Sequence, residues 1–156
     1  MKAKEIVVRE EKELDPQELW AFYVNNDCCE TRYGPERATS VLERSAVVVT
    51  ARDGDTLVGV ARAITDGLDA HIMELSVAPS HQGDKATHGA PLVEDDAFDV
   101  GRRLAAVLVE ALLAQGVCFI QGYAYKTELD FYKSAGFAVN TDHYPMHVDR
   151  RPPVTG

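Results

Sequence analysis

The sequence is poor in basic residues relative to acidic ones. Its 16 Lys and Arg residues stand against 25 Asp and Glu residues, so its formal net charge is -9. A protein that binds nucleic acid regardless of sequence needs a basic surface to displace counterions, and we therefore expect no nucleic-acid partner. The acidic surface favours a neutral or cationic partner, although it could equally serve only to keep the protein in solution.

The sequence also has few cysteines and no long apolar run. Cys28 and Cys29 are adjacent and Cys118 is distant, so the 3 cysteines indicate no disulfide framework. No run is long enough to span a bilayer, and the N-terminal residues turn acidic where a signal peptide would become apolar. We therefore expect a cytoplasmic protein that does not contact a membrane.

What the sequence does contain is a regular alternation of predicted strands and helices. A length of 156 residues suits one domain with one core, and residues 149–156 are expected to form a loose tail. The order β-α-α-β-β-β-α-β-α-β-β indicates an α/β fold with a mixed sheet covered on both faces, in three layers. Strands are predicted over residues 5–10, 46–51, 56–64, 70–78, 117–124, 137–140 and 144–148, and helices over residues 16–25, 35–44, 100–115 and 127–135. Asp15 is predicted to cap the first helix, and Pro16 suits its first position.

Four short motifs, in this order and spacing, resemble those of the GCN5-related N-acetyltransferase (GNAT) family. DGDTLVGVARAITDG, at residues 53–67, is similar to the second and third strands of that family. MELSVAPSHQG, at residues 73–83, resembles its fourth strand and the start of its pyrophosphate loop, and VGRRL, at residues 100–104, resembles the start of its central helix. The signature FYxxxGF of its last helix is matched by Phe131, Tyr132, Gly136 and Phe137.

The resemblance implies transfer of an acetyl group from acetyl-CoA to the amine of a small molecule or a peptide N-terminus. The cofactor would pair with the backbone of the fourth strand, and its pyrophosphate would bind the loop and the helix N-terminus. No other cofactor is implied. The cofactor-binding residues by this resemblance are Leu75, Val77, Gln82, Gly83, Val100, Gly101 and Arg102.

Two residues are candidates for proton transfer. The resemblance makes Tyr132 the general acid, because a phenol is protonated at neutral pH and can donate to the leaving thiolate; alternatively it only packs beneath the last helix. Glu74 is the candidate general base, because a carboxylate inside an apolar strand needs either a task or a partner. The alternative for Glu74 is a salt bridge with Arg62 on the neighbouring strand.

The acceptor site would lie between the loop at residues 25–35 and the predicted terminal hairpin. Glu30, Tyr33 and His143 are the candidate substrate residues there, since acidic and aromatic groups suit an ammonium ion. For each of these residues taken singly, ordinary solvation of a loop is the better explanation. His81 and His88 flank several carboxylates, but no spacing typical of metal ligands is present, so we expect no metal. The sequence leaves open whether the chain forms a homodimer.

The sequence departs from the family pattern by an insertion at residues 84–99. Asp99 takes a place that is normally glycine, where it would cap the helix and repel a pyrophosphate. In one interpretation, Gly89 and Pro91 form a turn, the acidic groups lie in solvent, and the cofactor still binds. In the other, the helix begins early, near residues 95–96, and partly fills the groove. The chain would then be a non-catalytic binding, sequestering or assembly module. The first is favoured because Tyr132 and the turn at Gln82 and Gly83 are both retained.

Overall fold

One five-stranded sheet forms the middle of the protein. The structure is a computed structural model, and it describes residues 5–86 and 90–154. The strands lie in the order β1-β2-β3-β4-β5, with the first four antiparallel and β5 parallel to β4. The strands are β1 (Ile6–Glu10), β2 (Val47–Asp53), β3 (Thr56–Thr65), β4 (Asp69–Val77) and β5 (Phe119–Gly122).

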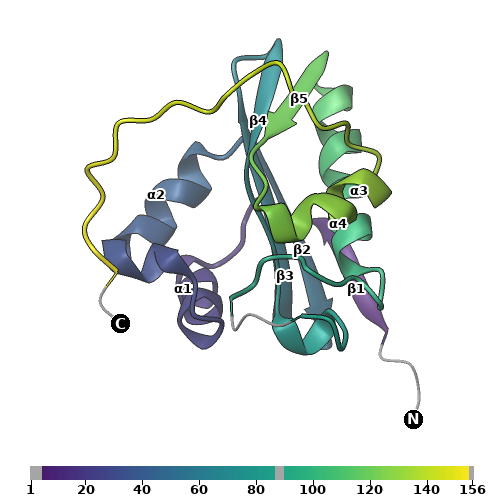
Figure 1. Cartoon of the computed structure of the whole chain (residues 1–156). Helices are drawn as coiled ribbons and strands as arrows, with labels where there is room; N and C mark the ends of the chain where they lie inside the picture. Colours follow the sequence, from purple (N-terminus) through teal and green to yellow (C-terminus); the bar gives the residue numbers. More distant parts are fainter. Residues whose placement is uncertain (1–4, 87–89, 155–156) are drawn as a thin grey trace.

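Helices cover both faces of this sheet. α1 (Pro16–Asn25) and α2 (Glu36–Arg44) lie on one side and α3 (Val100–Ala114) on the other (Figure 1). The predicted α/β fold in three layers is therefore confirmed. The remaining helical pieces are the 3-10 turns η1 (Cys29–Tyr33), η2 (Pro79–His81) and η3 (Lys126–Glu128), and the short helix α4 (Leu129–Ser134). No helix in the described ranges is long and apolar enough to cross a membrane.

Local sequence explains where the two main helices lie. Asp15 accepts a hydrogen bond from the Gln17 N–H at 2.8 Å, and Pro16 fills the first helical position, so α1 begins as predicted. α3 buries one apolar stripe against the sheet, formed by Val100, Leu104, Ala105, Leu108 and Leu112. Helical spacing puts these side chains on one face, and their burial holds the helix on the sheet.

β4 and β5 pair over only part of their length. The paired residues are Asp69–Ile72 on β4 and Phe119–Gly122 on β5. Beyond Ile72, β5 no longer pairs with β4, and a different segment of the chain contacts this edge of β4. Residues 91–93 take that place, because the Val77 N–H donates to the Pro91 carbonyl at 3.0 Å.

The predicted terminal hairpin is wrong. Residues 137–154 contain no strand, and Tyr144, Met146 and Val148 are 85%, 90% and 85% exposed. Instead, this segment runs without regular structure from α4 toward the side of α1 and α2 (Figure 1). A strand needs a partner edge, and this segment pairs with none in the described chain, so its alternation of apolar residues is not enough. Residues 149–154 also lack regular structure, and residues 155–156 lie outside the described residues.

Candidate active site

Glu74 lies at the centre of a buried polar cluster between β3, β4 and α1. Its side chain is only 3% exposed. One carboxylate oxygen, Oε1, accepts a hydrogen bond from the Tyr23 hydroxyl at 3.0 Å and one from Arg62 Nε at 3.3 Å. The expected salt bridge with Arg62 is therefore present. The second oxygen, Oε2, is buried and has no hydrogen-bond partner among the described residues.

Burial dominates the protonation of this carboxyl group. It raises the pKa of Glu74 to about 7, while the charge of Arg62 and the Tyr23 hydrogen bond act in the opposite direction and the charge of Glu30 adds to the rise. A carboxyl group with such a pKa exchanges its proton readily at neutral pH. Glu74 thus has a salt bridge and, in addition, a free oxygen suited to a proton acceptor.

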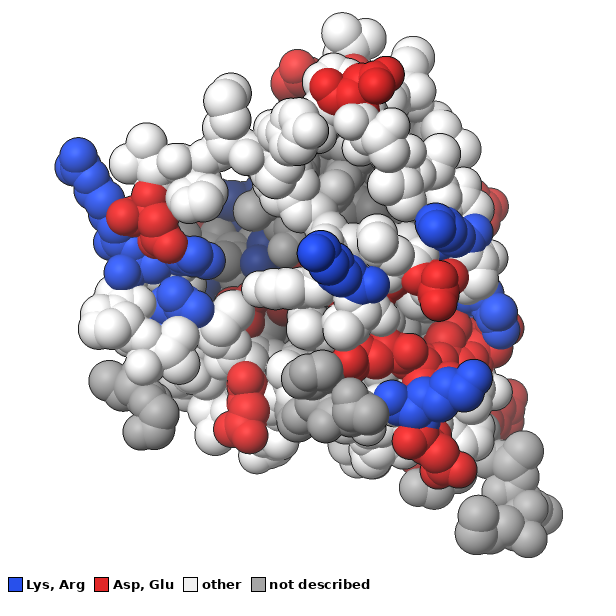
Figure 2. All heavy atoms as spheres, in the orientation of Figure 1, with Lys and Arg blue, Asp and Glu red and all other residues white. Residues whose placement is uncertain are grey.

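The predicted acceptor residues are only partly brought together. Glu30 lies in η1, close enough for its charge to raise the pKa of Glu74 and of the buried thiol of Cys28. Tyr33 lies in the same turn, with the guanidinium of Arg32 5.9 Å from its ring centroid. His143 is exposed in the C-terminal segment and does not belong to this cluster. Figure 2 shows the surface hollowed between that segment and the sheet, with acidic and basic groups inside the hollow.

Tyr132 lies on α4 in an aromatic cluster. Its ring contacts Phe131 and Phe137 edge-on, with centroid distances of 5.0 and 5.6 Å. Burial raises the pKa of its phenol, with a further contribution from the charge of Glu128. The phenol therefore stays protonated at neutral pH, as a proton donor must. Its role as general acid stays a prediction.

Gln82 does not face an open groove. Its side chain is fully buried, and its amide nitrogen donates to the carbonyls of Val77 and Leu92 at 2.8 and 2.7 Å. Its amide oxygen accepts from the N–H groups of Glu94 and Asp95 at 3.1 and 3.4 Å. This residue, expected to bind pyrophosphate, instead joins β4 to the inserted segment.

The N-terminus of α3 is occupied by a carboxylate from the same insertion. Asp96 accepts hydrogen bonds from the Gly101 N–H at 2.7 Å and from the Arg102 N–H at 3.0 Å. Asp99 makes no such cap. Its φ of 61° is left-handed, and its carboxylate pairs with the Arg102 side chain at 2.6 Å. The prediction that Asp99 caps the helix is therefore wrong, because the left-handed turn brings Asp96 to the helix end instead.

Both sequence-based interpretations of the insertion need correction. The acidic groups of residues 95–96 are hydrogen-bonded rather than in solvent, and Gly89 of the proposed turn lies outside the described residues. The central helix does not begin early, because α3 starts at Val100 and Phe98 is 61% exposed. Residues 91–96 instead contact the edge of β4 and the N-terminus of α3 without forming a helix.

Solved structures decide the fold. An acetyltransferase from Trypanosoma brucei is similar over 93% of this chain and 99% of its own, with a TM-score of 0.65 at 17% identity. The chain has the GNAT fold. A GNAT-family acetyltransferase from Streptococcus pneumoniae TIGR4 is similar over 94% of this chain and 100% of its own, with a TM-score of 0.59 at 18% identity.

A third similar GNAT-fold structure is an aminoglycoside acetyltransferase from an uncultured soil metagenomic sample. It is similar over 92% of this chain and 97% of its own, with a TM-score of 0.66 at 15% identity. No protein-family profile and no curated protein sequence matches the chain. The likeness is therefore one of fold, and the chemistry has to be argued from the residues.

Acetyl-CoA does not fit the GNAT groove in the conformation described here. The Val77 N–H is bonded to Pro91, and the first N–H groups of α3 are bonded to Asp96. Gly83, with a φ of +139°, has no free space, because a Cβ there would lie 2.3 Å from Asp95 Oδ2. The side chain of Val100 is buried in the core. Leu75 has no such hydrogen bond with the insertion; by strand alternation its N–H points to the same edge as that of Val77.

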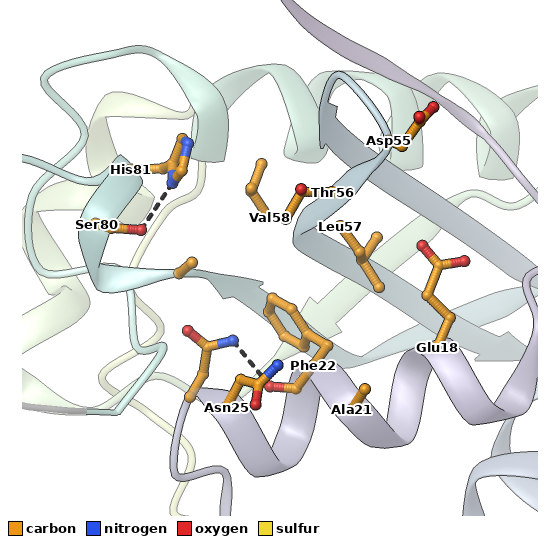
Figure 3. Close-up of a pocket in the computed structure, with 12 residues that line it drawn as sticks. Glu18, Ala21, Phe22, Asn25, Asp55, Thr56, Leu57, Val58, Ser80 and His81 are labelled. Carbon is orange, nitrogen blue, oxygen red and sulfur yellow. Dashed lines mark hydrogen bonds between the residues drawn. The ribbon is translucent and has the colours of Figure 1, made fainter.

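A pocket of about 370 Å³ lies elsewhere, between α1, the start of β3 and η2 (Figure 3). It contains none of the predicted site residues. Its lining includes His81, which bonds to Ser80 Oγ through Nδ1 at 2.8 Å and to Asp53 Oδ2 through Nε2 at 2.9 Å. The described residues contain no group of three or more His, Cys, Asp or Glu that could hold a metal, and His88 lies outside them.

Sequence reasoning missed two residues of the site. Tyr23 lies in the first predicted helix, but nothing in the sequence indicates its hydroxyl bond to Glu74, which joins residues 51 positions apart. Asp96 was seen only as a possible helix start, whereas it caps a helix that begins four residues later. The run of acidic residues before a predicted helix was the available signal, but it did not distinguish Asp96 from Asp99.

Proposed function

We propose that the chain is an acetyl-CoA-dependent N-acetyltransferase acting on the amine of a small molecule or a peptide N-terminus. The observation that carries this proposal is Glu74, a buried carboxyl group with a pKa of about 7 and one unpaired oxygen. The GNAT fold supports it, since structures with this fold include a glucosamine-6-phosphate N-acetyltransferase from Arabidopsis thaliana, with a TM-score of 0.63. Acetyl-CoA would supply the acetyl group as a thioester.

In this proposal the protein's own residues prepare the amine. An alkylammonium ion has a pKa near 10, so at neutral pH it must lose a proton before it can act as a nucleophile. Oε2 of Glu74 accepts that proton, directly or through one water. Tyr23 and Arg62 hold the other oxygen and keep the carboxylate in place. The negative charge of Glu30 favours the approach of the cation.

The filled groove favours a second candidate function. If residues 91–96 never leave β4 and the N-terminus of α3, no donor enters, and the chain is a non-catalytic binding or assembly module. The same buried Glu74 would then serve to bind an ammonium group rather than to deprotonate it. The two candidates differ in whether coenzyme A binds and whether an amine is consumed.

Thiol release from acetyl-CoA in the presence of a panel of small amines and peptides tests the proposal. The wild type should turn over at least one amine, and Glu74→Gln should lower kcat/KM by about 100-fold or more, as expected for loss of a general base. Glu110→Gln, an exposed change on α3, is the matched control and should leave the rate unchanged. Equal rates for all three proteins would remove Glu74 from its role. Absence of both turnover and coenzyme A binding would favour the non-catalytic module.

A further inference from the structure

Residues 91–96 lie along the unpaired edge of β4 and across the N-terminus of α3. Pro91 and Val93 are buried, with Val93 fully inaccessible to solvent. The Pro91 carbonyl accepts a hydrogen bond from the Val77 N–H, on the edge of β4, at 3.0 Å. Two residues further on, the Val93 N–H donates to the buried carboxylate of Glu128 at 3.0 Å.

The segment ends at Asp96, whose carboxylate lies at the N-terminus of α3. The Asp96 side chain is only 7% exposed, and its two oxygens accept from two N–H groups at the start of α3. Helix N-terminal N–H groups and the helix dipole bind anions in general, so a carboxylate placed there satisfies a site that could equally hold a phosphate. The side-chain amide of Gln82 binds the middle of the segment: its nitrogen donates to the Leu92 carbonyl, and its oxygen accepts from the Glu94 N–H.

Together, these contacts give the segment the pattern of a bound ligand. It presents a backbone carbonyl to a strand edge and, a few residues later, an anion to a helix N-terminus. A molecule with an extended amide arm and a diphosphate would use the same two sets of N–H groups. The segment and such a molecule cannot bind together, because each N–H group of Val77, Gly101 and Arg102 is already engaged.

We propose that residues 91–96 are an autoinhibitory segment that occupies the donor groove, and that coenzyme A binds only by displacing it. This inference rests on the proposed function, since it assigns coenzyme A to that groove. The segment is part of the same chain, so it competes with coenzyme A at any ligand concentration. The apparent Kd for coenzyme A is the intrinsic Kd divided by the fraction of molecules in which the segment is displaced.

Removal of the charge of Asp96 tests the proposal. Coenzyme A binding is measured by calorimetry for the wild type and for Asp96→Asn, and binding should tighten by about tenfold or more. Asp99→Asn is the matched control. It removes the same charge from the same loop, and Asn tolerates the left-handed conformation, but Asp99 does not touch the helix N–H groups. Its affinity should change by less than about threefold.

A second variant guards against misfolding. Asp96→Ser also removes the charge, and its hydroxyl oxygen can accept from at most one of the two helix N–H groups that Asp96 binds. It should also bind coenzyme A more tightly than the wild type does. If neither Asp96 variant binds more tightly than the wild type, or if none of the proteins binds coenzyme A at millimolar concentration, the proposal is overturned.

Hydrogen exchange of the wild type gives an independent readout. Saturating coenzyme A should speed exchange of the Val93 and Glu94 amides, which are bonded to Glu128 and Gln82 in the closed form. Unchanged protection of these amides overturns the proposal. If coenzyme A binds as expected but no amine is acetylated, the proposed transfer fails and the autoinhibitory segment stands. If amines are acetylated while the affinity is equal in all variants, the transfer stands and the autoinhibition fails.

Discussion

Replacing Glu74 by Gln should change how the stability of the protein depends on pH. Burial raises the pKa of this carboxyl group from 4.5 to about 7 on folding, so the folded state holds the proton more tightly than the unfolded state. The resulting stabilisation is fully present below about pH 4.5 and is lost as the pH rises through about 7. A rise of this size corresponds to about 3 kcal/mol, at about 1.4 kcal/mol per pKa unit.

Urea unfolding at about pH 5 and pH 8 measures this effect. The unfolding free energy of the wild type minus that of Glu74→Gln should fall by about 2–3 kcal/mol from the lower to the higher pH, because part of the stabilisation is already lost at pH 5. Glu110→Gln, which changes an exposed carboxyl group, should show a difference close to zero. A difference that stays constant, or that grows with pH, would refute the reasoning. It would mean that the charge of Arg62 outweighs burial and keeps Glu74 ionised throughout.

Four further variants test other parts of the structure. Tyr132→Phe should lower turnover by about 100-fold, as loss of a general acid does, with coenzyme A affinity unchanged by calorimetry; an unaltered rate would remove the phenol from catalysis. Gly101→Ala should lower the free energy of unfolding by about 1–3 kcal/mol in urea unfolding, because the new Cβ would lie 2.8 Å from Phe131 Cε2. An increase in stability, as Ala usually gives over Gly within a helix, would contradict this packing. Leu112→Ala should cost about 2–5 kcal/mol, whereas Leu113→Ala, at a position 56% exposed, should cost less than about 0.5 kcal/mol; equal costs would show that α3 is misplaced.

The fold could be predicted because its elements are determined locally. The cap at Asp15, the apolar stripe of α3 and the run of apolar strands each follow from neighbours in sequence, and the observed bounds differ by only a few residues. The C-terminal hairpin could not be predicted in the same way. Alternation at Tyr144, Met146 and Val148 indicates a strand, but a strand also requires an edge to pair with, and that is a property of the whole fold.

The site was less predictable, because its decisive contacts join distant residues. Glu74 stood out as a carboxyl group in an apolar strand, and strand pairing brought Arg62 opposite to it as expected. The cap of α3 was misassigned, because the rules for helix ends assume that the capping residue directly precedes the helix. Here Asp99 adopts a left-handed conformation, and the carboxylate of Asp96, three residues earlier, reaches the helix N-terminus instead.

Glu128 places a chemical requirement on whatever replaces residues 91–96. Its two buried oxygens accept from the Val93 N–H at 3.0 Å and the Tyr125 N–H at 3.1 Å. Loss of the first bond leaves a buried acceptor unsatisfied, at a cost of about 1–3 kcal/mol, unless the newcomer supplies an N–H of its own. Along the groove a ligand must therefore offer a hydrogen-bond acceptor to the Val77 N–H, then a donor to Glu128, then an anion to the N-terminus of α3. A molecule with the right shape but no donor at the second position would be rejected by roughly ten- to a hundredfold.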